Sequence, residues 1–134
     1  MRVPKIPTTG LVSVLLCALA GPLAAQRAAV TPLMTKDLPD IPGKEALMIT
    51  VVYPPGGSDP AHRHNADTFV YVLEGSVIMQ VKGGKPDTLK AGETFYEGPD
   101  DIHVVSRSAS STEPAKLLVL LVKKKGAPVL VPAQ

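Results

Sequence analysis

The sequence has almost no cysteine and very few aromatic residues. Its 134 residues include one cysteine, Cys17, no tryptophan, two phenylalanines and three tyrosines. A single cysteine has no partner within its own chain, so an internal disulfide is excluded even in an oxidising compartment. Stability must therefore come from packing, with help from a bound metal or a second subunit.

A signal-peptide pattern occupies the N-terminus. Two basic residues precede the apolar stretch 11–20, which Gly21-Pro22 interrupts before Leu23-Ala24-Ala25, a candidate cleavage site. The stretch is shorter than the roughly 20 apolar residues that a membrane-spanning helix needs, and a retained anchor is the alternative. We expect residues 1–25 to be a signal peptide cleaved near Ala25. The protein would then be exported, either periplasmic or secreted, without a stable membrane anchor.

The chain also lacks an excess of charge of either sign. Removing residues 1–25 from the 134 leaves 109 residues, which carry 12 basic and 12 acidic side chains. Nucleic-acid binding calls for a basic surface, so we expect no nucleic-acid partner. The remaining length suits one domain with a modest hydrophobic core.

Helical periodicity is missing throughout, and short β-strands separated by turns are predicted instead. The apolar run 115–123 fits a strand that is buried on both faces, and residues 76–82 alternate between apolar and polar side chains. The predicted strands cover residues 45–53, 67–74, 76–82, 87–90, 93–97, 103–107 and 115–123. Many short strands at this spacing predict an all-β sandwich or small barrel in a single domain, at residues 45–125.

Two proline-containing segments flank the predicted barrel. Residues 26–44 are expected to form an extended N-terminal arm that is either loose or lies across a sheet edge. Residues 126–134 are expected to form a C-terminal tail that packs loosely or pairs across a subunit boundary.

All three histidines of the chain are placed where one metal site could use them. His62 and His64 are separated by one residue, so in an extended segment both side chains lie on the same face. His103 follows about forty residues later, after another turn. Imidazole is a common ligand of zinc, iron, copper and nickel. We therefore predict a metal site that consists of these three histidines.

The spacing of these residues resembles the two motifs of the cupin family, small jelly-roll barrels that hold a metal inside the barrel. The first motif is matched at Gly56, His62, His64, position 68 and Gly75. The second motif is matched at Gly92 and His103, with Gly98 where the family has proline and Asp100 in place of a glycine. The resemblance covers residues 45–123 and implies a cupin-type jelly-roll β-barrel. It also implies dimerisation through the sheets, so a homodimer is an expected partner.

The sequence departs from the family at one ligand position. Thr68 stands where cupins have a glutamate that binds the metal. A neutral hydroxyl is a poor ligand beside a carboxylate, so the sequence predicts a site of three histidines with one more positive charge than usual. Such a site would bind an anionic or chelating ligand more readily, and Thr68 would face the pocket as a hydrogen-bonding group.

Other side chains near the motifs are candidates for the missing carboxylate or for the pocket wall. Asp67 is adjacent but points to the opposite face unless the strand bulges. Glu97 and Asp100 precede His103, and both are expected to be turn or rim residues in water. Tyr71 and Tyr96 are possible pocket residues, and ordinary packing is the alternative for both.

Three functional hypotheses remain open at this stage. In the first, His62, His64 and His103 bind one divalent transition metal (Fe, Zn, Mn, Ni or Cu), which acts on a small molecule in dioxygenase-like chemistry. In the second, the barrel is a non-enzymatic module that binds a metal or small ligand, because no histidine is left to act as a general base. In the third, the barrel holds no metal and is purely structural.

Overall fold

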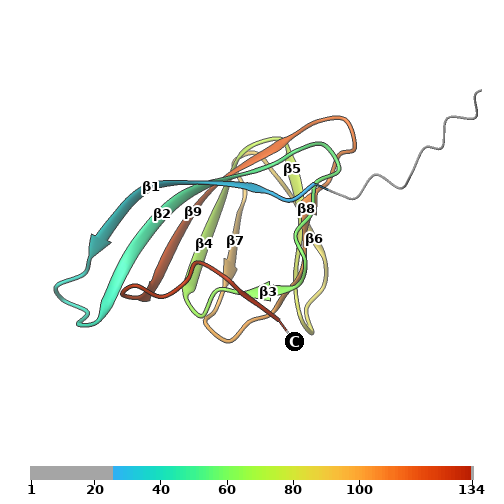
Figure 1. The fold of residues 1–134 in the computed structure, drawn as a ribbon. Helices are drawn as coiled ribbons and strands as arrows, with labels where there is room; N and C mark the ends of the chain where they lie inside the picture. The colour runs from blue at the N-terminus through green and yellow to red at the C-terminus, as the bar shows by residue number, and fades with distance from the viewer. Residues whose placement is uncertain (1–25, 134) are drawn as a thin grey trace, which may run out of the picture.

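Two five-stranded antiparallel β-sheets face each other across the core of the protein (Figure 1). The structure is a computed structural model and describes residues 26–133, so the expected signal peptide lies outside the described residues. The first sheet has the order β1-β2-β9-β4-β7 and the second has the order β10-β3-β8-β5-β6. This arrangement confirms the predicted all-β jelly-roll barrel. Among residues 26–133, no helix has the length and apolar character needed to cross a membrane.

The bounds of seven strands agree closely with the ranges predicted from the sequence, whereas β1, β3 and β10 were not predicted as strands. The first sheet contains β1 (Ala29–Asp37), β2 (Lys44–Tyr53), β9 (Ala115–Lys124), β4 (Asp67–Glu74) and β7 (Thr94–Glu97). The second sheet contains β10 (Val131–Pro132), β3 (His62–Arg63), β8 (His103–Ser108), β5 (Ser76–Val81) and β6 (Asp87–Lys90). The agreement reflects the turn residues, which end each strand where the pattern predicts.

The core lies between the inner faces of the two sheets. Alternate residues of β2, β4 and β9 point inward, as the period-two side-chain pattern of a strand requires. The largest fully buried apolar side chains are Met79, Leu117, Leu121, Val72 and Val77. Strand β9, which we predicted to be buried on both faces, is buried on one face and half-buried on the other. Its outward residues point away from the core because the second sheet covers only the inner face.

The N-terminal arm forms a strand at the edge of the first sheet. Strand β1 pairs with β2 along its length, and the register shifts between Pro32 and Met34. Proline has no N–H to donate, which is why it is confined to edge strands and irregularities of this kind. All nine residues of β1 are exposed, so this strand contributes hydrogen bonds more than core.

The C-terminal tail closes one end of the barrel. Strand β10 pairs with β3, and Ala133 donates its N–H to the carbonyl of Ala61 (3.2 Å). The start of the tail is held by a buried ion pair, in which the ammonium of Lys123 donates to Glu45 Oε1 (2.5 Å) and to the carbonyl of Ala127 (2.6 Å). The tail therefore packs on its own barrel, next to the strand that carries His62.

The Glu45–Lys123 pair predicts a pH dependence of stability. The hydrogen bond from Lys123 lowers the pKa of Glu45 below its ordinary value, although burial opposes the change. A carboxyl with a lowered pKa in the folded state stabilises the protein above its unfolded pKa of about 4.3, and this contribution is lost as the pH falls through the folded pKa. The melting temperatures of the wild type and of Glu45→Gln should therefore differ most near about pH 7 and become similar near about pH 3. A difference that stayed constant over this range would contradict the role of the pair.

Candidate metal centre

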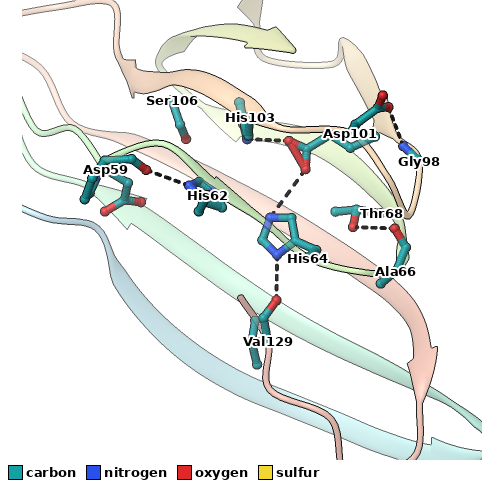
Figure 2. Close-up of polar contacts among 12 residues, drawn as sticks. Asp59, His62, His64, Ala66, Thr68, Gly98, Asp101, His103, Ser106 and Val129 are labelled. Atoms are coloured by element: carbon teal, nitrogen blue, oxygen red, sulfur yellow. Dashed lines mark hydrogen bonds and ion pairs between the residues drawn. The ribbon is translucent and has the colours of Figure 1, made fainter. Parts of the chain in front are cut away.

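The three histidines meet inside the barrel at the end that the tail closes. His62 on β3 and His103 on β8 are direct cross-strand partners, and their ring centroids are 5.1 Å apart. The ring centroid of His64 lies 4.9 Å from that of His62. One ligand nitrogen from each ring lies within 4.8 Å of the others, a grouping that could hold a metal ion (Figure 2). The residues that the sequence singled out are thus brought together.

A β-bulge helps to aim His103 into the barrel. Gln80 pairs with Val105 and Val81 pairs with His103, so β8 contains one extra residue at this point. Such a bulge shifts the alternation of a strand, which allows both His103 and Ser106 to be buried on the inner face.

Backbone carbonyl groups orient the first two rings. His62 Nδ1 donates to the carbonyl of Pro60 (2.8 Å), and His64 Nδ1 donates to the carbonyl of Val129 (2.6 Å). A carbonyl oxygen can only accept, so the proton of each neutral ring lies on Nδ1 and the lone pair on Nε2 is free for a metal. The C-terminal tail, which the sequence analysis did not connect with the site, supplies the carbonyl that fixes His64 (Figure 2).

Glu97 lies within the histidine cluster, where we expected a rim residue in water. Its side chain is buried, with 3% of the residue exposed. Glu97 Oε1 contacts His103 Nδ1, and Glu97 Oε2 is 3.4 Å from His64 Nε2. The prediction was wrong because Glu97 is the last residue of β7, on the inward side, and does not belong to the turn that follows. Phe95, two residues earlier, packs against the core, and this period-two relation was the signal that could have placed Glu97.

Two buried polar atoms of the cluster have no hydrogen-bond partner among residues 26–133. They are Glu97 Oε1, which lies against His103 Nδ1, and His103 Nε2. Buried polar atoms of this kind are rare and call for an explanation such as an ion. A divalent cation would satisfy an imidazole nitrogen and a carboxylate oxygen together, so the donor set fits a metal.

The charge states of the cluster also suit metal binding. Burial raises the pKa of Glu97. The contact with His103 and the nearby rings of His64 and His62 lower this pKa by more than burial raises it, so the pKa of Glu97 lies below its ordinary value. Burial lowers the pKa of His62, which keeps this ring neutral. Metal ligands must be deprotonated, and both residues are therefore in the form that binds.

The remaining candidates divide according to which strand face they occupy. Thr68 is buried, lines the cavity and donates to the carbonyl of Ala66 (3.4 Å), so it faces the site. Tyr71 and Tyr96 are exposed on the outer face and do not line the cavity, so neither is a pocket residue. Tyr71 follows the inward Val70 by one residue, and alternation sends it outward.

The two aspartates considered as replacement ligands lie outside the site. Asp67 accepts a hydrogen bond from the hydroxyl of Tyr96 (2.7 Å) on the outer face of the first sheet. Asp100 is exposed in the turn between β7 and β8, as we expected. Glu97 is therefore the carboxylate that reaches the histidines.

The histidines open onto a cavity of about 80 Å³ inside the barrel. Its walls are mainly apolar and include Val30, Ile49, Val51, Val70, Met79, Leu117, Val119, Val129 and Leu130. A second polar group, formed by Tyr53, Asp59 and Ser106, also lines it. The Tyr53 hydroxyl donates to Asp59 Oδ2 (2.9 Å) and contacts Ser106 Oγ, and burial strongly raises the pKa of Tyr53. The space suits a small molecule of a few heavy atoms held beside the cluster.

Comparison with known proteins places the chain in a family. The cupin domain pattern matches residues 49–121, more than half of the chain, and the protein belongs to the cupin family. No curated protein matches the sequence closely enough to count as a relative.

Several solved structures share the fold. The DMSP lyase DddQ from Ruegeria pomeroyi is 22% identical with a TM-score of 0.64, over 80% of this chain and 52% of that chain. A recombinant oxalate oxidase in complex with glycolate is 25% identical with a TM-score of 0.61, over 90% of this chain and 62% of that one. A cupin domain from Bordetella pertussis is 19% identical with a TM-score of 0.58, over 75% of this chain and 98% of that domain's chain. This chain thus spans about half of the lyase and somewhat more of the oxidase.

Proposed function

We propose that this cupin binds one divalent transition metal through His62, His64 and His103. The observation that carries the proposal is the convergence of three buried or half-buried imidazoles whose ligand nitrogens lie within 4.8 Å of one another. Two of these rings are already fixed with Nε2 free, and the third has a buried nitrogen without a partner among the described residues. Iron, zinc, manganese, nickel and copper all accept such a donor set.

The metal would serve chemistry on a small molecule in the cavity. When bound, it would supply a Lewis acid and a template for an oxygen-donor ligand, in dioxygenase-like or related chemistry. The apolar walls would exclude water, and the hydrogen-bonded group of Tyr53, Asp59 and Ser106 would orient a polar atom of the ligand. The oxalate oxidase neighbour, which is described in complex with glycolate, supports a small oxygen-rich ligand.

Metal content tests the proposal directly. Protein purified from the exported fraction, or refolded and dialysed against each of the five metals, should retain one ion per chain. The matched control is Asp100→Asn, which removes an exposed carboxylate three residues from His103 and should leave the metal content unchanged. Protein that retains no metal under any of these conditions would overturn the proposal in favour of a purely structural barrel.

A non-enzymatic binding module is the second candidate. It is favoured by the state of the cavity groups, because Nδ1 of His62 and of His64 is engaged and the pKa of Tyr53 is strongly raised. With the three histidines bound to the metal, none of them is left to act as a general base. Oxygen uptake by the metal-loaded protein with thiols, flavonols and diketones separates the two candidates, since only an enzyme turns over.

Export and a homodimer are proposed with the same function. The signal-peptide pattern of residues 1–25 supports export, and the mass of the mature protein recovered from the exported fraction tests it. The apolar side chains of Leu33 and Met34, which are exposed on β1, support a second copy of the chain as the partner of that strand. Light scattering after size-exclusion chromatography should give a mass of two chains for the wild type. The Leu33→Lys variant should give the mass of one chain.

A further inference from the structure

Thr68 and Glu97 occupy facing positions on adjacent strands. They are direct cross-strand partners of β4 and β7, both are buried, and both line the cavity beside the histidines. Side chains that face each other in an antiparallel pair have Cβ atoms about 4.5–5.5 Å apart. A carboxylate on either strand can therefore reach the same volume at the barrel interior.

The contacts of Glu97 are those of a group that shares an ion with the histidines. Its Oε2 is 3.4 Å from His64 Nε2, the ring nitrogen that is left free when Nδ1 donates to Val129. Consider two donor atoms that each lie about 2.1 Å from one ion. If the donor–metal–donor angle is between the octahedral and the tetrahedral value, the two donors are about 3.0–3.4 Å apart. The observed separation falls at the upper end of that range.

The other oxygen of Glu97 supports the same interpretation. Glu97 Oε1 lies against His103 Nδ1, so the same buried carboxylate approaches two of the three imidazoles. A buried carboxylate that contacts two rings of the cluster is placed to share a cation with them.

We propose that Glu97 is the fourth metal ligand of this protein, supplied by β7 in place of the glutamate that Thr68 replaces on β4. The ligand set then consists of three imidazoles and one carboxylate, and the charge of the metal centre is one unit lower than a three-histidine site would have. The inference rests on the proposed function, since it requires that the histidines bind a metal.

Zinc affinity of the mature protein, measured by competition with a chromophoric chelator, tests the assignment. Loss of a partner that only orients a ligand typically costs about 10- to 100-fold in affinity, so Glu97→Gln should raise the Kd of zinc by about 100-fold or more. Asp100→Asn is the matched control, because it removes an exposed carboxylate outside the site, and it should leave the Kd within about threefold of the wild type. The d–d absorption of bound cobalt(II) should change in Glu97→Gln and not in the control.

The decisive variant exchanges the two positions. In the double variant Thr68→Glu/Glu97→Thr the carboxylate returns to β4, and the Kd of zinc should recover to within about tenfold of the wild type. If Glu97 only oriented His103 from β7, a glutamate on β4 would not restore zinc binding. If Glu97→Gln binds zinc like the wild type, or if the folded exchange variant shows no recovery, Glu97 is not a ligand although the histidine site stands. A wild type that binds no zinc or cobalt would instead remove the histidine site itself, and this inference with it.

The single substitution Thr68→Glu should have opposite effects in a three-histidine site and in a site that already contains Glu97. With an empty ligand position, a new glutamate would tighten metal binding. With Glu97 already present, it places a second buried carboxylate opposite the first, and like charges in such a site oppose each other. The Kd of zinc for Thr68→Glu should not fall below that of the wild type, and a tenfold fall would contradict the role of Glu97.

Discussion

Replacing His103 with alanine should remove metal binding and destabilise the metal-free protein at the same time. His103 is buried, and it is the cross-strand partner of His62 and a direct contact of Glu97. Loss of a residue that only orients a ligand already costs about 10- to 100-fold in metal affinity, so loss of a ligand should exceed about 100-fold. The substitution also leaves the buried carboxylate of Glu97 without its nearest ring, at a cost of about 1–3 kcal/mol.

The two effects can be separated with a second substitution. In His103→Ala/Glu97→Gln the buried charge is removed, and part of the lost stability should return while zinc binding stays absent. Chemical denaturation in the presence of a chelator measures the first quantity, and a chelator competition assay measures the second. A His103→Ala variant that binds zinc like the wild type would show that the three histidines do not share an ion.

Saturation with metal should raise the melting temperature of the wild type by roughly 15 °C or more. A ligand present at about 1,000 times its Kd stabilises the folded state by about 4 kcal/mol. A domain of about 100 residues gains roughly 4–8 °C for each kcal/mol. Differential scanning fluorimetry with zinc and with a chelator measures this shift, and His103→Ala serves as the control that should show none.

The thermal shift should also depend on pH. Metal binding requires neutral imidazoles, whose ordinary pKa is about 6.5. Because burial lowers the pKa of His62, this ring stays neutral to a lower pH than an exposed histidine. The stabilisation by metal should therefore be present near about pH 7.5 and lost as the pH falls below about pH 5. A shift of equal size at both pH values would indicate a site without histidine ligands.

The strands and the histidine trio could be predicted from the sequence because both depend on local patterns. Turn residues and period-two alternation fix where β4, β5 and β6 begin and end. The spacing of His62, His64 and His103 matches two motifs, each contained within a short segment. Alternation alone also sends Thr68 inward, and the same rule places Tyr71 outward.

The parts that could not be predicted depend on which strands become neighbours. The pairing of Thr68 with Glu97 is a property of the β4–β7 register, and no local pattern specifies it. The carbonyl of Val129 reaches His64 across 65 positions of the chain, through a tail that we expected to pack loosely or to pair across a subunit boundary. Tyr53, Asp59 and Ser106 come from separate segments and meet only in the folded barrel.

A crystal structure of the zinc-loaded protein, with anomalous scattering measured at the zinc edge, tests the central claim most directly. We expect a single strong peak inside the barrel, within bonding distance of His62, His64 and His103 and of one carboxylate oxygen of Glu97. A peak elsewhere on the molecule, or no peak in a crystal grown with excess zinc, would contradict it.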